Sequence, residues 1–314
     1  MSLIKSISGI RGTIGGVPDE NLTPIDAVKF AAAYGTWLKE TLNKANIKVV
    51  VGRDARISGE MIQNLVQYTL VGLGINVVDI GLSTTPTVEV AVTMEKADGG
   101  IILTASHNPK QWNALKLLNN KGEFLSAKEG ERILTIAQEN KVVFADVEDL
   151  GSISHDNTYI QKHIEAVLGL LTSSTIEAIR NCKFKVVVDA VNSTGGIAIP
   201  KLLEHFGVEV VRLYCEPNGH FPHNPEPLKE HLGDICKKVL EEKADFGIVV
   251  DPDVDRLAFI TEEGEMFGEE YTLVACADYI LGKTKGNVVS NLSSSRALRD
   301  IAEKYGVQYA AGAV

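Results

Sequence analysis

Short runs of β-branched and other apolar residues alternate along the chain with longer segments in which apolar positions recur every three or four residues. The first pattern predicts strands and the second predicts amphipathic helices. In the first half we predict strands at residues 47–51, 76–80 and 100–104, and helices at 59–73, with Ser58 as N-cap, and at 86–95. Such alternation from the start of the chain is typical of parallel α/β proteins.

The same alternation restarts near residue 185. We predict strands at 185–189, 209–213 and 246–250, and helices at 196–206 and 228–242. A third block follows, with strands at 257–261, 287–291 and 307–311 and helices at 269–281 and 295–305. The polar stretch at 151–157 separates the first two blocks and is the best candidate for a linker.

These blocks predict tandem α/β domains whose mixed, largely parallel sheets are sandwiched between helices. We expect one domain over residues 1–152, a second over 153–257 and part of a third over 258–314. The third block would be marginal as a unit on its own, because so short a segment buries little apolar surface. We therefore expect the sequence to be part of a longer protein.

The composition is that of an ordinary globular protein, with 314 residues, 45% hydrophobic residues and a mean hydropathy near zero. A formal net charge of −10 argues against a general nucleic-acid-binding protein, which would carry a basic face. The cysteines form no Cys-x-x-Cys pair, so zinc and redox sites lack support: Cys182, Cys215, Cys236 and Cys276. With neither a signal-peptide pattern nor a membrane-spanning apolar run, we expect a cytoplasmic protein without nucleic-acid or membrane partners; the sequence indicates no oligomeric state.

Three carboxylates, Asp251, Asp253 and Asp255, stand at alternate positions after a predicted buried strand. Neighbouring carboxylates repel each other unless a cation lies among them, and an open set of oxygen ligands suits Mg²⁺. An EF-hand loop is disfavoured, because its sixth position is Arg256 instead of Gly and the flanks are strands. A solvated acidic turn remains an alternative. So does an aspartyl-phosphate enzyme of the haloacid-dehalogenase type, in which Asp251 would be the nucleophile.

A second polar loop, Thr-Ala-Ser-His-Asn-Pro at 104–109, also follows a predicted strand. It could be a simple turn in which the Asn-Pro pair ends the strand. A Ser–His hydrolase is less favoured, because the chain has no Gly-x-Ser-x-Gly segment and a sequence-adjacent histidine is poorly placed to accept the serine proton. As a phosphate carrier, Ser106 would need a metal, positive charge and a proton acceptor, all of which the chain can supply. Both loops are expected at one site, since ligands gather beyond the carboxyl ends of strands in open α/β sheets.

Five segments resemble motifs of the α-D-phosphohexomutases, the family of phosphoglucomutase, phosphomannomutase and phosphoglucosamine mutase. Gly9-Ile10-Arg11-Gly12 resembles the N-terminal arginine motif, residues 104–109 resemble the phosphoserine loop, and residues 251–256 resemble the metal loop. Asn113-Ala114-Leu115-Lys116 resembles the Asn-Gly-hydrophobic-Lys segment, with Ala114 in place of the usual Gly. The second-domain loop is resembled by Glu216-Pro217-Asn218-Gly219, followed by Phe221-Pro222 and Asn224-Pro225. Their order and approximate spacing agree with the family from residue 1 to about residue 260.

The resemblance implies four α/β domains around a central active site, with the third incomplete and the fourth absent from this sequence. Ser106 would be phosphorylated in the resting enzyme. One Mg²⁺ would be held by Asp251, Asp253, Asp255 and an oxygen of the Ser106 phosphate. The metal and the phosphoryl group would therefore share one site.

The resemblance also assigns roles to four other residues. Lys116 would be the general acid/base, with a pKa lowered by neighbouring cations, or would act only through its charge on phosphate. His107 would orient the reactants or share the proton transfer. Arg11 and Arg256 would hold phosphoryl oxygens through forked hydrogen bonds.

The implied reaction interconverts hexose 6-phosphate and hexose 1-phosphate through a hexose 1,6-bisphosphate, an intramolecular phosphotransfer of class EC 5.4.2. We read residues 264–268 as a turn and not as the family's sugar-reading loop, so glucose, mannose and glucosamine phosphates are not distinguished. The chain as given is expected to be weakly active or inactive. The alternatives are a Mg²⁺-dependent phosphatase or phosphomutase using Asp251, and a non-catalytic sugar-phosphate-binding protein. For Arg53 and Arg56 an ordinary surface position remains the default interpretation, and both are left out of the predicted site.

Overall fold

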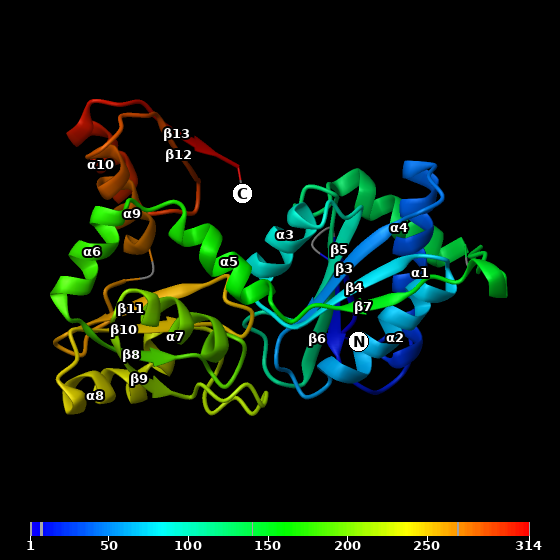
Figure 1. Cartoon of the computed structure of the whole chain (residues 1–314), viewed down its shortest axis with the longest axis horizontal. Helices are drawn as coiled ribbons and strands as arrows, with labels where there is room; N and C mark the ends of the chain where they lie inside the picture. The colour runs from blue at the N-terminus through cyan, green and yellow to red at the C-terminus, as the bar shows by residue number, and fades with distance from the viewer. Residues whose placement is uncertain (1, 7–8, 140, 269, 314) are drawn as a thin grey trace.

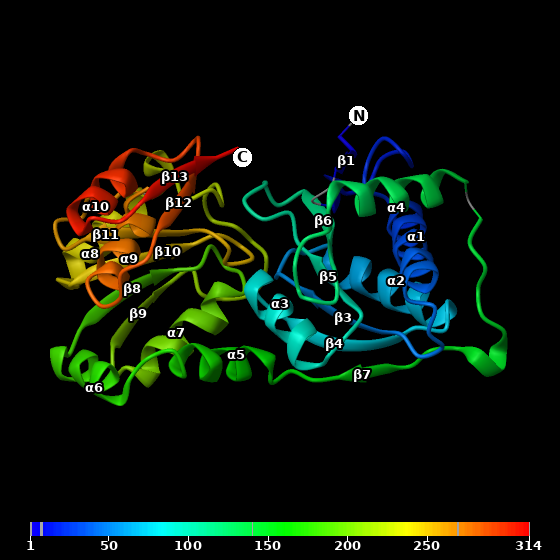
Figure 2. The same cartoon turned by 90° about the horizontal axis from the view of Figure 1, so that it is seen from above.

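The computed structural model describes residues 2–6, 9–139, 141–268 and 270–313, which form two α/β lobes and a smaller third part (Figures 1 and 2). In Figure 1 the first lobe lies on the right and the second on the left, with the orange and red C-terminal part above the second lobe. Strands and helices alternate in both lobes, so the predicted α/β class with mixed sheets flanked by helices is confirmed.

Seven strands form the sheet of the first lobe, in the order β1 (Ile4–Ser6), β2 (Gly9–Thr13), β6 (Trp112–Leu118), β5 (Gly99–Leu103), β3 (Lys48–Arg53), β4 (Asn76–Leu82) and β7 (Ile153–His155). The strands β5, β3, β4 and β7 run parallel, whereas β1, β2 and β6 pair antiparallel. Because the parallel strands point the same way, the loops that follow β3 and β5 lie at one edge of the sheet.

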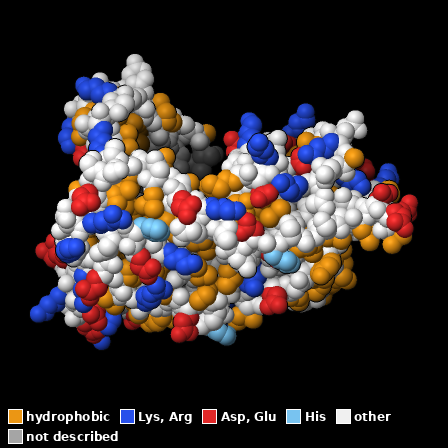
Figure 3. Space-filling view, in the orientation of Figure 1, with side chains coloured by type: hydrophobic (Ala, Val, Ile, Leu, Met, Phe, Trp, Pro, Cys, Tyr) orange, Lys and Arg blue, Asp and Glu red, His pale blue; other side chains and the backbone are white. Residues whose placement is uncertain are grey.

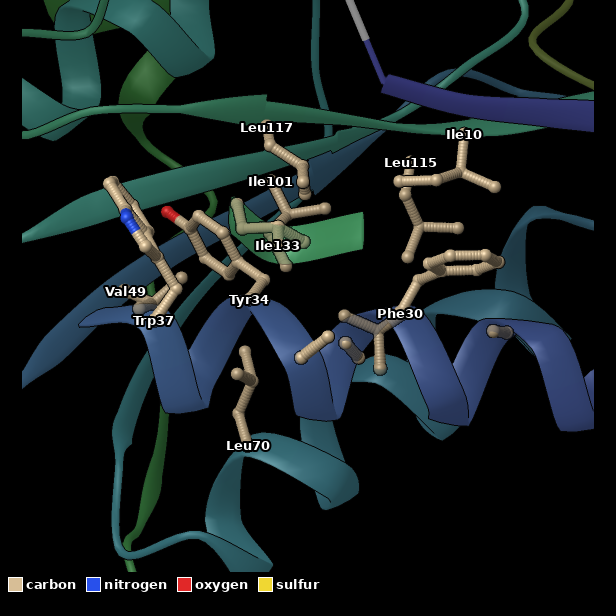
Figure 4. Close-up of a cluster of buried hydrophobic side chains, with 14 of the residues drawn as sticks. Ile10, Phe30, Tyr34, Trp37, Val49, Leu70, Ile101, Leu115, Leu117 and Ile133 are labelled. Carbon is tan, nitrogen blue, oxygen red and sulfur yellow. The ribbon is translucent and has the colours of Figure 1, made fainter. Parts of the chain in front are cut away.

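Helices cover both faces of this sheet: α1 (Pro24–Leu42), α2 (Gly59–Gly72) and α4 (Ala127–Glu139) pack on one face and α3 (Thr85–Met94) on the other. Alternate residues of β3 point to opposite faces, so Val49 and Val51 join the α1 side while Val50 joins the α3 side. Figure 4 shows side chains from α1 directed at the sheet: Phe30, Tyr34 and Trp37 toward Ile10, Ile101, Leu115 and Leu117. The Tyr34 hydroxyl donates to the Leu118 carbonyl at 2.7 Å, which satisfies the polar end of a buried ring.

The helix predicted to start after Ser58 begins where expected, at Gly59, but Ser58 does not cap it. The Ser58 side chain makes no capping hydrogen bond, and its Oγ instead accepts a hydrogen bond from the Asn113 Nδ2 at 3.0 Å. By contrast, α1 has a complete capping box, in which Thr23 and Asp26 bond each other's backbone N–H groups. The Ser58 hydroxyl therefore bonds a residue of β6 instead of the first turn of α2.

The predicted linker at 151–157 is only partly a linker. Residues Ile153–His155 form β7, which pairs parallel with β4 at the edge of the first sheet. The next helix, α5 (Tyr159–Leu168), packs against α3, and the Tyr159 hydroxyl bonds the Glu95 carboxylate. The polar composition of this stretch reflects an exposed edge strand, which has one face and one edge toward solvent.

The second lobe has four strands in the order β11 (Leu257–Thr261), β10 (Phe246–Val250), β8 (Lys185–Asp189) and β9 (Glu209–Leu213). All four were predicted with these bounds. Only β11 runs antiparallel to its neighbour. The surrounding helices are α6 (Ser173–Cys182), α7 (Gly195–His205) and α8 (Gly233–Glu242). Of two short 3₁₀ turns, the first, Val147–Asp149, precedes β7 in the first lobe, and the second, Lys229–His231, precedes α8. The helix predicted at 228–242 is thus shorter, because its first residues form the second 3₁₀ turn.

The C-terminal part contains α9 (Tyr271–Leu281), β12 (Val288–Asn291), α10 (Ala297–Tyr305) and β13 (Tyr309–Gly312), with β12 and β13 paired in parallel. Residue 269, where the first of these helices was predicted to begin, lies outside the described residues.

Since β7 joins the first sheet and β11 the second, the predicted domain boundaries after residues 152 and 257 do not coincide with the limits of the sheets. The division of the chain into domains at these positions stays a proposal. Within the described ranges, none of the helices has the length and apolarity needed to cross a bilayer.

A partly buried histidine of the second lobe, His223, provides a pH-dependent contribution to stability. The His223 Nε2 lies 3.0 Å from Asp189 Oδ2, and its Nδ1 lies 2.8 Å from the Asn224 carbonyl. Burial alone would lower the pKa of His223, but the hydrogen bond and charge of Asp189 outweigh it and raise the pKa above the usual 6.5.

We expect this pair to stabilise the fold most in acid solution. A raised folded-state pKa means that the stabilisation is fully present below the unfolded pKa and is lost as the pH rises through the folded pKa. His223→Gln keeps a donor for Asp189 but carries no charge. The difference in free energy of unfolding between the wild-type protein and H223Q, measured by urea titration, should therefore be larger at about pH 5.5 than at about pH 9. An equal difference at both pH values would contradict the assignment.

Candidate active site

The two loops singled out in the sequence meet between the lobes. Ser106 follows β5 in the first lobe, and Asp251 follows β10 in the second. The Ser106 Oγ donates a hydrogen bond to Asp251 Oδ2 at 2.9 Å and lies 3.5 Å from Asp255 Oδ1. Figure 3 shows the molecular surface hollowed along its upper edge, between the C-terminal part and the first lobe. The hydroxyl and the carboxylates are therefore in direct contact, although 145 positions separate Ser106 from Asp251.

Ser106 has an unusual backbone conformation, with φ at +50°. A side chain with a Cβ rarely adopts this left-handed region, and such strain is often found at functional sites. The side chain is 9% exposed, and its Oγ lies 3.3 Å from Nδ1 of the adjacent His107. The sequence-based view that a neighbouring histidine is poorly placed to reach the serine was wrong, because the left-handed turn brings the two side chains together.

The three aspartates form a compact cluster. Their potential ligand oxygens all lie within 4.8 Å of one another, and Asp251 and Asp253 are fully buried. Asp251 Oδ1 accepts hydrogen bonds from the backbone N–H groups of Asp255 and Arg256, both at 3.1 Å, which holds the loop in a tight turn. Burial, together with the negative charges of Asp253 and Asp255, raises the pKa of Asp251 well above its usual value. Two of the three carboxylates are thus shielded from water, whereas Asp255 is exposed.

The chemistry of this cluster fits a divalent cation with oxygen ligands. Asp253 Oδ2 accepts hydrogen bonds from the Thr85 hydroxyl at 2.6 Å and the Lys116 amine at 2.7 Å. Asp253 Oδ1 is buried and has no hydrogen-bond partner among the described residues. A buried carboxylate oxygen without a partner is costly, and a cation between the three acids would satisfy it. Carboxylate and phosphate oxygens are the ligands that Mg²⁺ prefers.

Lys116 lies against the acids and not against cations. Its Nζ is 2.7 Å from Asp253 Oδ2 and 3.1 Å from Asp255 Oδ2. Burial alone would lower the pKa of Lys116, but the two carboxylates reverse the effect and raise it. The predicted lowering of this pKa was therefore wrong. In this arrangement the Lys116 side chain is a cation that offsets part of the charge of the acidic loop.

Arg11 reaches the same site through strand pairing. Arg11 of β2 stands opposite Ala114 of β6, and Lys116 lies on the same face two residues further along. These residues line a cavity of about 240 Å³ together with Ser106 and other site residues. The Arg11 Nε is buried without a partner among the described residues, so a donor remains available to an anion in that cavity.

Arg256 is placed differently from the other predicted residues. Its Nη1 donates to Glu226 Oε1 at 2.7 Å, and its side chain borders a separate cavity of about 270 Å³. Burial of the imidazole lowers the pKa of His107, and the charge of Arg256 lowers it further. Arg256 thus still influences the site. The Glu226 contact engages one of the five N–H donors of the guanidinium.

Sequence reasoning missed several residues that shape the site. Arg56, read as a surface residue, is 1% exposed and donates to the Ser106 carbonyl at 2.6 Å. Thr85 bonds Asp253 through both its side chain and its backbone N–H, and the Ser193 hydroxyl donates to the Pro252 carbonyl at 2.7 Å. The one available signal was position: Arg56 and Thr85 both follow predicted strands, at the sheet edge where the two loops were expected.

Comparisons with known proteins place this arrangement in a family. The sequence profile described as "Phosphoglucomutase/phosphomannomutase, alpha/beta/alpha domain I" matches residues 4–143, and the profile for domain II matches residues 159–264. A phosphoglucomutase/phosphomannomutase of Thermococcus kodakarensis is 35% identical over 301 residues, covering 95% of this chain and 65% of that protein. A probable phosphoglucosamine mutase of Methanopyrus kandleri is 32% identical over 301 residues, covering 95% and 63%. The chain thus spans slightly less than two thirds of the length of these relatives.

Solved structures agree with this result. A putative phosphomannomutase from Thermus thermophilus superimposes with a TM-score of 0.86 and 26% identity, covering all of this chain and 70% of the other. A family protein from Burkholderia thailandensis shares the fold, with a TM-score of 0.83 at 24% identity. The resemblance drawn from the five sequence segments is confirmed. The chain belongs to the phosphoglucomutase/phosphomannomutase family.

Proposed function

We propose that the protein is a phosphohexomutase that moves a phosphoryl group between carbons 6 and 1 of a hexose phosphate by way of Ser106. The observation that carries this proposal is the buried contact between the Ser106 hydroxyl and the acidic cluster, at 2.9 Å from Asp251. The two partners come from different lobes, so the fold assembles this contact from distant parts of the chain. The mutase names of the curated relatives support the same reaction class.

In the proposed reaction a hydroxyl oxygen of the hexose monophosphate forms a bond to the phosphorus of phosphorylated Ser106, and the P–Oγ bond breaks. The hydroxyl loses its proton, the Ser106 oxygen gains one, and the products are a hexose 1,6-bisphosphate and free serine. Transfer of the other phosphoryl group back to Ser106 completes the isomerisation. The sugar must turn around between the two steps, since both pass through the same serine.

The charged residues around Ser106 have separate roles in the proposed reaction. His107, with Nδ1 at 3.3 Å from the serine oxygen, is positioned to hold the proton that is exchanged. Lys116 and Arg11 line the cavity beside Ser106 and would bind phosphoryl oxygens by charge and hydrogen bonds. The assignment of Lys116 as general acid/base stays a proposal, and its raised pKa keeps the amine charged, which suits binding of phosphoryl oxygens.

Asp251, Asp253 and Asp255 would hold Mg²⁺ together with an oxygen of the phosphorylated serine. When bound, the cation would supply charge neutralisation for the phosphoryl oxygens. The chain's own contribution is to keep the three carboxylates together through backbone donors, Thr85 and Lys116. Arg256 would join the phosphate-binding group through guanidinium donors other than the one bound to Glu226. A cytoplasmic location and the choice among glucose, mannose and glucosamine phosphates stay predictions.

The alternative with an aspartyl phosphate at Asp251 is less well supported by the geometry. Both oxygens of the Asp251 carboxylate already accept hydrogen bonds, Oδ1 from two backbone N–H groups and Oδ2 from Ser106. The carboxylate is also fully buried. A nucleophile at this position would have to lose these donors before it reached phosphorus.

The test is interconversion of hexose 1-phosphate and hexose 6-phosphate with and without added hexose 1,6-bisphosphate. We expect the bisphosphate to stimulate turnover, because it phosphorylates any free Ser106 and returns the enzyme to its active form. For the chain as given we expect a rate well below a typical enzyme turnover of about 10 per second. Conversion that does not respond to the bisphosphate would contradict the proposal, and absence of conversion with firm sugar-phosphate binding would support the non-catalytic alternative.

A further inference from the structure

Arg56 lies directly behind the Ser106 loop and uses every hydrogen-bond donor it has. The guanidinium carries five N–H groups in a fixed planar arrangement. Its Nε donates to Asp54 Oδ2 at 3.0 Å, and each Nη donates to two backbone carbonyls of the loop that contains Ser106 or of the first residue of β6. The four acceptors are Ser106 at 2.6 Å, Asn108 at 2.7 Å, Pro109 at 2.8 Å and Trp112 at 2.9 Å.

The partner of Arg56 fixes the loop from its other end. Asp54 Oδ2 also accepts a hydrogen bond from the Thr104 hydroxyl at 2.7 Å. The Thr104 oxygen in turn accepts the backbone N–H of Ser106 at 2.9 Å. Both the N–H and the carbonyl of Ser106 are thus tied to the same buried ion pair. These two bonds brace the residue whose φ is +50° and whose hydroxyl points at Asp251.

The ion pair is sealed from water by the second lobe. The side chains of Asp54 and Arg56 are both 0% exposed. The Phe221 ring lies over the guanidinium, with Cζ at 5.1 Å from the ring centroid. Gly219, at φ +74°, packs so closely that a Cβ there would lie 2.1 Å from the Ala55 carbonyl oxygen.

The same loop of the first lobe is connected to the acidic loop. The Ala55 N–H donates to the Ser193 Oγ at 3.3 Å, and the Ser193 hydroxyl donates to the Pro252 carbonyl at 2.7 Å. Residues 54–56 therefore contact the serine loop directly and are linked to the Asp251 loop through Ser193. They are placed to set the distance between the two.

We propose that the Asp54–Arg56 ion pair is the positioning element of the reaction, which holds Ser106 in its left-handed conformation with the hydroxyl facing the acidic cluster. The inference rests on the proposed function of Ser106, and it assigns to Arg56 no contact with substrate. Lysine cannot replace the guanidinium, because its three donors on one nitrogen cannot reach five acceptors in two directions. A small displacement of Ser106 is enough to slow the reaction, since phosphoryl transfer depends on close alignment.

The test compares Arg56→Lys with Arg53→Lys, a matched control on the same strand end. Arg53 donates to Gln63 and to the Asp54 carbonyl, and none of its described hydrogen bonds reaches the serine loop. Single-turnover transfer from hexose 1,6-bisphosphate to Ser106 is measured, in which the sugar–phosphate bond breaks and the serine proton passes to the sugar oxygen. We expect R56K to lower the rate constant about 100-fold while the half-saturating bisphosphate concentration stays unchanged. R53K should retain the wild-type rate.

Hydrogen exchange of the backbone amides supplies a readout that does not depend on phosphoryl transfer. R56K should accelerate exchange at residues 104–112 and leave the rest of the chain unchanged. If R56K disrupts folding, Thr104→Val and Thr104→Ser take its place: T104V removes the acceptor for the Ser106 N–H, and T104S restores it. T104V should be slow and T104S close to wild type.

The outcomes separate the two proposals. A wild-type rate in R56K, or equal losses in R56K and R53K, would overturn the positioning role. Faster exchange spread over the whole chain would show that the pair acts only on stability, and would overturn it as well. If the wild-type chain is never phosphorylated on Ser106, the proposed function fails; faster exchange confined to 104–112 would then still support positioning of the loop, and unchanged exchange would refute it.

Discussion

Replacing Ser106 with alanine should reduce phosphoryl transfer by roughly 10⁴-fold or more, the largest effect expected of any single substitution in this chain. The substitution removes the oxygen that would form the bond to phosphorus, and a neighbouring group cannot take its place. The fold should be retained, because the backbone bonds that hold residue 106 run through its N–H and carbonyl groups. The measurement is the single-turnover rate with hexose 1,6-bisphosphate, alongside thermal unfolding of the same sample.

Ser83→Ala is the matched control for this experiment. Ser83 follows β4 at the same edge of the sheet, is 1% exposed, and its Oγ has no hydrogen-bond partner among the described residues. S83A thus removes a buried serine hydroxyl of the same lobe without touching the site, and should transfer phosphate at the wild-type rate. Full turnover in S106A would refute the role of Ser106 and favour the aspartyl-phosphate alternative.

Asp251→Asn should abolish the stabilisation of the protein by Mg²⁺. A cation that binds only the folded state at 100 times its dissociation constant stabilises that state by about 2.7 kcal/mol. In D251N the cluster loses one of its three negative charges and a ligand oxygen, so the effect of added Mg²⁺ should fall to near zero. Without Mg²⁺ the variant should be at least as stable as the wild type, because the substitution relieves repulsion from Asp253 and Asp255. Thermal unfolding with Mg²⁺ and with EDTA measures both effects.

Asp245→Asn is the corresponding control. Asp245 precedes the same strand, β10, at its opposite end, is exposed, and accepts a hydrogen bond from the Lys185 N–H at 2.7 Å. Its neutralisation should leave the response to Mg²⁺ unchanged. Equal responses to Mg²⁺ in D251N and the wild type would show that the cation binds elsewhere and would contradict the proposed metal site.

The strands of the second lobe show how far local pattern determines structure. The four predicted segments 185–189, 209–213, 246–250 and 257–261 match the observed strands residue for residue. Each is a short, largely apolar run that contains two or three β-branched residues and is bounded by polar or turn-forming ones, so the chain's own pattern sets both ends. The cap of a helix, by contrast, can depend on a distant residue. Ser58 was expected to cap α2, but its hydroxyl bonds Asn113, which lies 55 positions away in the sequence.

The contents of the site could be predicted better than their electrostatics. Ser106 and the three aspartates were identified because each type of side chain follows a buried strand in a pattern that suits phosphate or metal. The raised pKa of Lys116 could not be predicted, because it depends on carboxylates that lie 137 and 139 positions away and belong to the other lobe. Arg56 was misread for the same reason. The local sequence around Arg56 does not indicate burial, because the serine-loop and β6 carbonyls that its guanidinium binds lie 50 to 56 positions away.

The most direct test of the whole account is to locate phosphate on the protein after exposure to hexose 1,6-bisphosphate and Mg²⁺. Intact-mass measurement should show one added phosphate per chain, and peptide mass spectrometry should place it on Ser106. The modification should survive hydroxylamine, which cleaves an aspartyl phosphate but not a phosphoserine. Phosphate found on Asp251, on another serine, or on no residue at all would contradict the claim that Ser106 carries the phosphoryl group.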